Sequence, residues 1–382
     1  LLFNNAEIGS IYDRIISDAK DMLKFILSSK QSMTFEKHSL EYLDKLRLRR
    51  NVEIDFPFSY EIKLLASLLG VNKTEWKDIK SIDSVLVAYD SNVFYIVDKT
   101  DGSIYEFDSE GLKSSIRFMV DMLNKSDLNS YIFLSGVDPQ KYGEDVFIPT
   151  NTSSFRLPKL SATSEISESG AEEIANYFFD KDLTTVRSIV EPSGTIIYTD
   201  GTEKGIKIDR NGLIEYVSYS YQTKSPKVGM TLESAVSIAT DFINEHLGFP
   251  KDAYISSIEP IINNGNLESC IIRYSYRYEG IPIINDNLDM DNPIEIEVSD
   301  GEIKSFKRLV RDVVRTEEMK SIKNPLEIMD IVHKRLRQDE DLDLSYISIT
   351  DIYLSYFEYD YDSNISMIPV WIVHVGMDQG RV

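Results

Sequence analysis

Few side chains of this protein are suited to nucleophilic or acid–base chemistry. Its 382 residues include one cysteine and four histidines: Cys270, His38, His246, His333 and His374. Catalysis by a serine or cysteine nucleophile usually requires a neighbouring base. However, His246 and His333 fall on amphipathic helical patterns, and His374 alternates with apolar residues in the strand-like segment VWIVHVG. We therefore interpret the histidines as structural residues and Cys270 as a small hydrophobic residue of a strand.

The sequence contains no motif of a familiar catalytic or phosphate-binding loop. G-x-S-x-G, H-E-x-x-H, C-x-x-C, G-x-x-x-x-G-K-[ST] and G-x-G-x-x-G are all absent. Ser17 and Lys20 match S-x-x-K, but their helical segment predicts a solvated surface. Because 63 residues are Asp or Glu, their proximity in sequence identifies no acid–base pair. We predict no catalytic residue and no cofactor; an unrecognised enzyme would require a deep pocket with two convergent carboxylates.

Two acidic segments carry oxygen ligands of the kind that hard cations bind. DYDSN, starting at Asp360, begins like a calcium-binding loop. However, Ile365 occupies the position where that loop needs glycine, and Trp371 the position of the bidentate glutamate. NDNLDMDNP, starting at Asn285, has carboxylates without a suitable spacing. We interpret both segments as turns and predict no metal site.

The charge of the chain argues against nucleic acid as a partner. Its 63 acidic residues outnumber 41 Lys and Arg residues, so the net charge is −22 at pH 7. This charge repels phosphate backbones and anionic lipid surfaces. The sequence starts with LLFNNAEIGS, without Met, and no segment approaches the roughly 20 apolar residues of a membrane-spanning helix. We expect that an upstream segment has been removed.

Local patterns predict a multi-domain α+β protein in which antiparallel hairpin sheets pack against helices. In a first domain, residues 1–150, apolar spacing predicts a helix over residues 8–27. An alternating segment around Pro57 is typical of an edge strand, and a short helix follows that ends at Gly70. Residues 84–108 have the β-branched and aromatic runs of successive hairpins.

A central domain, residues 151–228, is predicted to consist mainly of β-hairpins. The polar residues 149–170 are the best linker candidate, and a helix is expected over residues 170–179. Asp200-Gly201 and Asn211-Gly212 are dipeptides that two-residue hairpin turns prefer, because both turn residues need a positive φ. The same pattern occurs in DGSIYEF and DGEIKSF, so it identifies turns and no function.

The last domain, residues 229–382, contains a weak internal repeat. TLESAVSIATDFI followed by YISSIEPII recurs as NPLEIMDIVHKRL followed by YISITDIYL. Each copy predicts a helix and then long antiparallel strands, with Thr231 and Asn324 as the helix N-caps. We therefore expect a duplicated unit of one helix and an antiparallel sheet.

The wording of several segments resembles a known family. FFDKDLTTVRSIVEPSGTIIYTDGTEKGIKIDRNGLIEYVSY resembles the central segment of the YycH family. YRYEGIPI, IEVSDGEIKSFKR and ISMIPVWIVHVG resemble the C-terminal domain that the YycH and YycI families share. The resemblance covers about residues 170–380. The matching residues, for which we expect structural roles, are Arg187, Tyr198, Asp200, Gly201, Tyr216, Gly280, Pro282 and Trp371.

The resemblance implies a role that depends on protein contacts. Members of this family are membrane-anchored, extracytoplasmic regulators in Gram-positive cells, with one N-terminal transmembrane helix and an α+β body outside the membrane. They bind the cell-wall sensor histidine kinase WalK, also called YycG, together with the sister regulator YycI, and modulate the kinase. The resemblance implies no catalytic residue.

A second hypothesis is an extracytoplasmic module that binds a ligand or inhibits a protease. Residues 229–382 also resemble PepSY-type domains, which have a helix packed on hairpins. In this hypothesis, tyrosine-rich strands such as YSYRYEG line a groove for a peptide or glycan. The alternative for the same strands is an ordinary half-buried antiparallel face.

Overall fold

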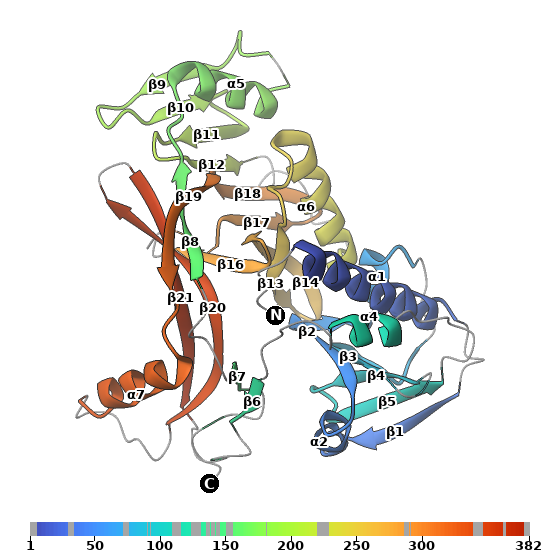
Figure 1. The fold of residues 1–382 in the computed structure, drawn as a ribbon. Helices are drawn as coiled ribbons and strands as arrows, with labels where there is room; N and C mark the ends of the chain where they lie inside the picture. Colours follow the sequence, from blue (N-terminus) through green and yellow to red (C-terminus); the bar gives the residue numbers. More distant parts are fainter. Residues whose placement is uncertain are drawn as a thin grey trace. The chain divides into compact units, whose positions relative to one another are not determined.

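The computed structural model describes two compact units. The first comprises Leu1–Leu128 and Thr231–Ser234, and the second Asn129–Met230 and Ala235–Val382. Figure 1 shows the elements of both. Within these units the structure describes residues 6–29, 34–71, 76–89, 91, 93–108, 116–123, 131–134, 138, 142, 146–149, 156–180, 182–219, 229–285, 290, 292–338, 347–361 and 364–377.

The first unit contains a five-stranded antiparallel sheet in the order β1-β5-β4-β3-β2. Its strands are β1 (Phe35–Ser39), β2 (Asn51–Glu61), β3 (Ser81–Ala88), β4 (Val93–Asp98) and β5 (Ser103–Asp108). β2 lies at an edge, as the alternating segment around Pro57 predicts. Proline has no backbone N–H to donate, so a strand that contains it is tolerated at the edge of a sheet. The predicted hairpins are confirmed as β3, β4 and β5.

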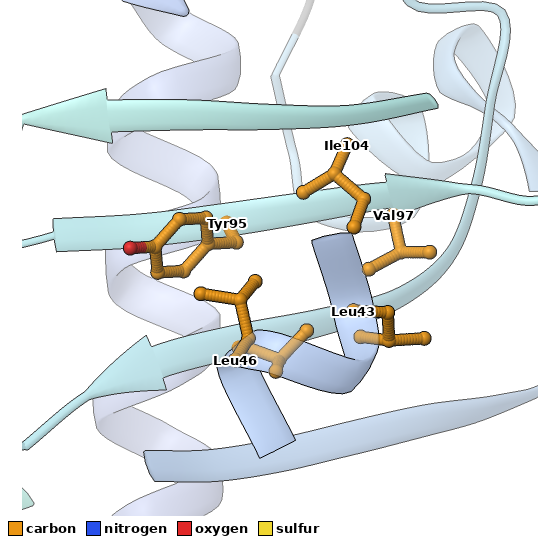
Figure 2. Close-up of a cluster of buried hydrophobic side chains, with 6 residues drawn as sticks. Leu43, Leu46, Tyr95, Val97 and Ile104 are labelled. Carbon is orange, nitrogen blue, oxygen red and sulfur yellow. The ribbon is translucent and has the colours of Figure 1, made fainter. Parts of the chain in front are cut away.

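Helices cover both faces of this sheet. They are α1 (Ala6–Ser28), α2 (Tyr42–Arg47), α3 (Ile62–Leu68) and α4 (Ile116–Leu123). On one face, Leu43 and Leu46 of α2 pack against Tyr95, Val97 and Ile104 (Figure 2). On the other face, Trp76 donates its indole N–H to the Ile26 carbonyl oxygen of α1 at 2.8 Å and contacts the Phe107 ring. Burial on both faces explains the continuous apolar runs Val85–Ala88 in β3 and Val93–Val97 in β4.

The second unit contains an eight-stranded antiparallel sheet in the order β13-β14-β17-β18-β12-β11-β10-β9. Its strands are β9 (Arg187–Val190), β10 (Ile196–Thr199), β11 (Lys204–Ile208), β12 (Leu213–Ser218), β13 (Tyr254–Asn263), β14 (Asn266–Ser275), β17 (Ile294–Ser299) and β18 (Glu302–Leu309). The domain boundary that we expect near residue 228 falls inside this unit. The sheet takes strands from both sides of that boundary, since β12 pairs with β18.

Two predicted helices pack against this sheet: α5 (Glu168–Phe178) and α6 (Leu232–His246). Thr231 caps α6 as predicted, because its hydroxyl oxygen accepts the Ser234 backbone N–H at 3.2 Å. Gly248 follows the helix at φ +68°, and its N–H donates to the Ile243 carbonyl oxygen. Between α5, α6 and the sheet, the rings of Phe178, Phe242 and Phe306 contact one another.

A six-stranded mixed sheet has the order β15-β16-β20-β21-β8-β19. Its strands are β8 (Arg156–Thr163), β15 (Arg277–Tyr278), β16 (Ile281–Asn285), β19 (Asp312–Ser321), β20 (Ile347–Tyr361) and β21 (Asn364–Met377). Among the pairs of described strands in this sheet, the pairing of β16 with β20 is parallel and the others are antiparallel. α7 (Pro325–Leu336) precedes β20 and is capped, as predicted, by the Asn324 side chain. β6 (Tyr131–Phe133) and β7 (Phe147–Pro149) form a separate pair.

The linker predicted over residues 149–170 is wrong for its central part, which is β8. Alternate residues of β8, namely Pro158, Leu160 and Ala162, are buried. The polar residues between them suggested a linker. The strands that pair with β8 are β19 and β21, and both are distant from it in sequence. Pairing with distant strands leaves no local signal.

The mixed α+β class predicted from the sequence is confirmed, whereas the duplication stays a prediction. Helix α6 precedes the hairpin β13–β14, and α7 precedes the hairpin β20–β21. The two hairpins belong to different sheets. Among the described helices, none combines the length and apolar composition needed to span a membrane.

The prediction of two-residue turns at Gly201 and Gly212 is wrong. Each glycine has a positive φ, but Asp200 and Asn211 do not, and each turn spans four residues between its strands. In such a four-residue turn the left-handed conformation is needed at the glycine position and not at the residue before it. Two-residue turns in which both residues have a positive φ occur instead at residues 264–265, 279–280 and 300–301.

Candidate functional site

The eight family-matching residues do not converge on one reactive centre. Arg187 lies on the exposed edge strand β9, and Asp200 and Gly201 lie in the turn from β10 to β11. Gly280 and Pro282 belong to the β15–β16 hairpin. The remaining three are Tyr198 in β10, Tyr216 in β12 and Trp371 in β21.

Tyr198 and Tyr216 are buried core residues of the eight-stranded sheet. The Tyr216 ring lies 5.3 Å from Phe178 of α5 and 5.5 Å from Phe242 of α6, measured between ring centroids. Burial raises the pKa of both phenols above the ordinary value. Both tyrosines therefore stay neutral, and Tyr216 packs both helices against the sheet.

Asp200 organises the turn between β10 and β11. Its Oδ1 accepts backbone N–H groups of Thr202, Glu203 and Lys204 at 2.9, 2.8 and 3.1 Å. Burial alone would raise the pKa of Asp200, but these three donors hold it below the ordinary value. The carboxylate is therefore ionised, and its Oδ1 is occupied by three backbone donors, which suits a structural role.

The β15–β16 hairpin is attached to β20 by polar and aromatic contacts. The Ser355 hydroxyl donates to the Pro282 carbonyl oxygen at 2.8 Å. The Tyr278 and Tyr356 rings meet edge to face at 6.1 Å. Gly280 has φ +83°, which the two-residue turn requires.

Trp371 connects β21 to the start of α7. Its indole N–H donates to the Lys323 carbonyl oxygen at 2.9 Å. Its ring packs at the margin of a buried cluster that includes Met329 of α7 and Ile349 of β20. Loss of this side chain would thus loosen a helix from a sheet.

Sequence reasoning missed a buried ion pair between Arg311 and Glu358. Arg311 donates to Glu358 Oε1 from Nε at 2.9 Å and from Nη2 at 2.8 Å, and the two side chains are 6% and 7% exposed. Its Nη1 donates to the carbonyl oxygens of Asn211 and Val310 at 2.8 and 3.0 Å. One guanidinium thus joins the turn before β12, the end of β18 and strand β20. No sequence pattern indicates it, because the charges are 47 residues apart.

The four histidines all contact aromatic rings. His38 stacks on Tyr42 at 4.3 Å, and His246 stacks on Phe242 at 3.8 Å between ring centroids. The corresponding partners of His333 and His374 are the nearby rings of Tyr142 and Tyr353. Burial lowers the pKa of His246, so its ring is neutral at physiological pH. These contacts support the structural interpretation of the histidines.

Cys270 and the tyrosine-rich segment belong to the core. Cys270 is fully buried in β14, and burial raises the pKa of its thiol to about 11. The thiol is therefore unreactive, and Cys270 is a small hydrophobic residue of a strand, as predicted. In YSYRYEG, Tyr274 and Tyr276 are only 4% and 7% exposed. The groove of the second hypothesis is therefore excluded for these two residues, and the alternative of an ordinary packed face holds for them.

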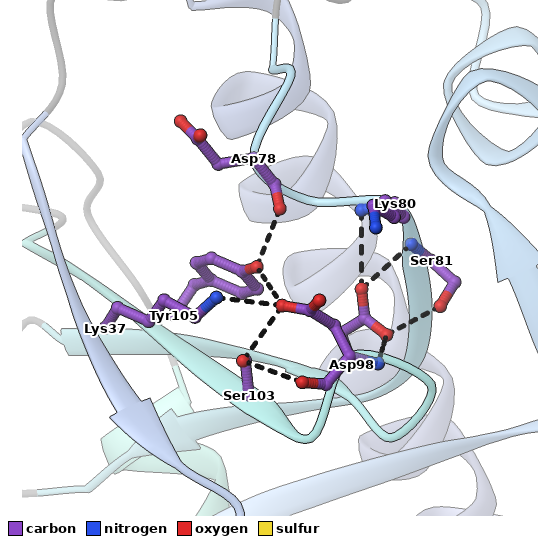
Figure 3. Close-up of polar contacts among 8 residues, drawn as sticks. Lys37, Asp78, Lys80, Ser81, Asp98, Ser103 and Tyr105 are labelled. Carbon is purple, nitrogen blue, oxygen red and sulfur yellow. Dashed lines mark hydrogen bonds and ion pairs between the residues drawn. The ribbon is translucent and has the colours of Figure 1, made fainter.

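The first unit contains a dense polar network around the turn from β4 to β5 (Figure 3). Lys37 of β1 pairs with Asp101 at 2.8 Å, and Ser103 and Tyr105 also donate to Asp101 Oδ2. The Lys37 hydrogen bond is the largest influence that lowers the pKa of Asp101 to about 2. Buried Asp98 accepts the Ser81 backbone N–H and hydroxyl at 3.1 and 2.7 Å. The network locks the turn that the sequence predicted at Asp101-Gly102.

One cluster in the described part of the chain has the composition of a cation site. Single donor atoms of Glu36, His38 and Glu106 lie within 4.8 Å of one another. His38 Nε2 lies 3.0 Å from Glu106, so an ordinary hydrogen bond already explains this pair. The Glu36 side chain is 80% exposed. Asp362, from the acidic segment DYDSN, lies outside the described residues.

Comparison with known proteins places the chain in a family. The family model described as YycH protein, C-terminal domain, matches residues 143–379. The fold resembles the crystal structure of YycH from Bacillus subtilis, with a TM-score of 0.61 at 12% sequence identity, over 98% of this chain and 91% of that chain. An uncharacterized protein from Eubacterium rectale ATCC 33656 aligns with a TM-score of 0.41 at 17% identity, over 62% and 83% of the two chains.

No curated protein matches the sequence. The family model nevertheless covers more than half of the chain, including all eight family-matching residues. The Bacillus subtilis structure agrees with it at the level of the fold. The chain therefore belongs to the YycH family.

Proposed function

We propose that this protein is a non-enzymatic, extracytoplasmic regulator of a WalK/YycG-type sensor histidine kinase. It binds the kinase together with a YycI-like sister regulator and biases the kinase between its signalling states. The match of the YycH family model to residues 143–379 is the observation that carries this proposal. A regulator of this kind acts through a difference in its affinity for the two kinase states.

The roles of the family-matching residues support a scaffold rather than a reactive centre. Asp200 and Gly280 shape turns, Tyr216 fixes helices on a sheet, and Trp371 connects a helix to a strand. Internal packing of this kind keeps a partner-binding surface rigid, and a rigid surface loses less conformational entropy on binding. The net charge of −22 favours partners with basic surfaces and speeds their encounter.

The proposal includes attachment to the membrane by a single helix upstream of Leu1. In the proposed arrangement both described units lie outside the cytoplasm. Confinement to one membrane raises the effective concentration of regulator and kinase, so that weak contacts suffice. We also propose that residues 229–382 arose by duplication of a helix and hairpin.

Binding to the extracytoplasmic region of the kinase tests the proposal. That region is immobilised, and binding of the purified chain is measured by interferometry with and without the sister regulator. We expect saturable binding whose association rate falls as salt is added, because the acidic surface steers the encounter. Absence of saturable binding both with and without the sister regulator would contradict the proposal.

A further inference from the structure

Strand β9 lacks the features that protect three other edge strands, β2, β13 and β19. β2 contains Pro57 and a register irregularity, and β13 contains Pro260 and two register shifts. β19 has a register shift between Arg315 and Met319. Such features protect edges from pairing with another chain. β9 contains neither proline nor lysine, and its register with β10 is regular.

The apolar side chains of β9 are unusually exposed. All four residues of the strand are exposed, and Ile189 and Val190 retain 53% and 61% of their accessible surface. β9 is the last strand in the sheet order, so its outer edge has no partner strand among the described residues. An unprotected edge with exposed apolar side chains is a template for strand pairing.

The hydrogen-bond pattern identifies which backbone groups face outward. The Glu191 N–H donates to the Thr195 carbonyl oxygen at 2.8 Å, and Ile189 is opposite Ile197. In an antiparallel pair, hydrogen-bonded and non-hydrogen-bonded positions alternate. Arg187, Ile189 and Glu191 therefore direct their backbone groups towards β10. Ser188 and Val190 direct theirs to the open edge.

The sequence Arg187-Ser-Ile-Val-Glu191 is complementary to itself when two copies run antiparallel. Centred on Ile189, the pairing places each Ser188 opposite Val190 of the second copy, and these are the residues with outward backbone groups. Each Arg187 is then opposite Glu191 of the second copy, at a non-hydrogen-bonded position where side chains lie closest. Neither Arg187 nor Glu191 has an ion-pair partner within the described part of the chain.

We propose that β9 is a self-association edge, through which two copies of this protein pair antiparallel about Ile189. The pairing joins the two eight-stranded sheets into one continuous sheet. It buries two isoleucines against each other and forms two Arg187–Glu191 ion pairs. The contact is small, and interfaces below about 1,200 Å² are usually weak. The dimer is therefore reversible and depends on protein concentration.

Charge reversal tests this pairing by sedimentation equilibrium of the soluble chain. We expect the average mass to rise above the monomer mass of 43.8 kDa as the concentration increases. Arg187→Glu alone, or Glu191→Arg alone, places like charges at both ends of the interface. Each change is expected to weaken the dimer about tenfold.

Restoration of the charges gives the decisive result. The double variant Arg187→Glu/Glu191→Arg regains the wild-type association, and so does an equimolar mixture of the two single variants, in which every facing pair has opposite charges. Val190→Pro removes an outward N–H without breaking the β9–β10 bonds and abolishes the dimer. The control Ile262→Lys, at a 65% exposed position of the β13 edge, leaves the dimer intact. Circular dichroism verifies that each variant is folded.

Two results would overturn the proposal. A wild-type chain that stays monomeric at its highest soluble concentration would exclude self-pairing. A dimer that is indifferent to the charge reversals and to Val190→Pro would place the interface elsewhere. The proposal does not depend on binding to a kinase, because the measurement uses this chain alone.

Discussion

At the residue scale, the Arg311–Glu358 pair has the largest predicted effect on stability. Both charges are removed from water, and among the described residues they are compensated by their mutual contact and by the carbonyl oxygens around Arg311. Removal of one member of such a pair leaves an unpaired buried charge, which typically costs about 3–5 kcal/mol, whereas an apolar replacement of both is often tolerated. The pair therefore stabilises the fold mainly by making each partner indispensable to the other.

We predict that Arg311→Met lowers the free energy of unfolding by about 3–5 kcal/mol. The double variant Arg311→Met/Glu358→Leu is expected to recover more than half of this loss, because no charge is left unpaired. Urea unfolding measures the stability of both variants. Trp76→Phe is included in every protein compared, so that the fluorescence of Trp371 reports unfolding of the second unit alone. Equal stability of Arg311→Met and the wild type would show that Glu358 is solvated and not buried.

A second prediction at this scale concerns Asp101. Its pKa is lowered to about 2 by Lys37, so its ionised form stabilises the folded state. This contribution is complete above the ordinary pKa of 3.8 and is lost as the pH falls towards 2. We expect a carbon-13 titration of the Asp101 carboxyl to have its midpoint near 2, and Lys37→Met to move it towards 3.8. A wild-type midpoint near 3.8 would contradict the ion pair.

At the scale of elements, two glycines with similar backbone conformations have different surroundings. Gly201 and Gly212 have φ values of +83° and +91°. A Cβ atom at Gly201 would meet nothing within 4 Å, whereas one at Gly212 would lie 2.7 Å from the Val310 carbonyl oxygen. The atom that blocks a side chain at Gly212 is this backbone carbonyl oxygen of Val310. It also accepts a hydrogen bond from the Arg311 guanidinium, so it cannot move away freely.

We predict that Gly201→Ala destabilises the protein by about 1 kcal/mol, the cost of a left-handed alanine. Gly212→Ala is expected to cost about 3 kcal/mol, because the steric overlap adds to the same conformational cost. Thermal unfolding of both variants compares the two sites, with Gly201→Ala as the matched control. Equal losses of stability would mean that the β12 turn does not approach Val310 closely.

Elements whose signals are local could be predicted from the sequence. The caps Thr231 and Asn324, the helix end at Gly70 and the edge position of Pro57 depend on neighbouring residues, and the structure confirms each. By contrast, the assignment of β8 to a sheet depends on partners more than 150 residues away, such as Arg315. The turn type could not be predicted either, because the same dipeptide gives turns of different length. Asp200-Gly201 lies in a four-residue turn, and Asp300-Gly301 forms a two-residue turn.

Of the candidate site, the sequence could predict the residues but not their arrangement. The eight family-matching residues follow from sequence similarity to the family, whereas their separation over two sheets is a property of the fold. The Arg311–Glu358 pair has no sequence signature, because one Arg and one Glu among 104 charged residues carry no positional information (41 basic and 63 acidic). Their pairing follows from the approach of β20 to the end of β18.

At the scale of the whole molecule, family membership and fold agree. The YycH family model covers residues 143–379, and the fold similarity to the Bacillus subtilis YycH structure extends over 98% of the chain. The proposed regulation needs no reactive centre, only a surface that distinguishes two states of the kinase. Self-association through β9 would present that surface twice and so increase the avidity for a dimeric partner.

The phosphorylation level of the response regulator that the kinase controls tests the proposed function most directly. It is measured in cells that lack this gene, and in cells complemented with the full-length, membrane-attached protein or with the soluble chain. We predict that deletion changes the phosphorylation level and that the full-length protein restores it, whereas the soluble chain does not. An unchanged level in cells that also lack the sister regulator would contradict the account.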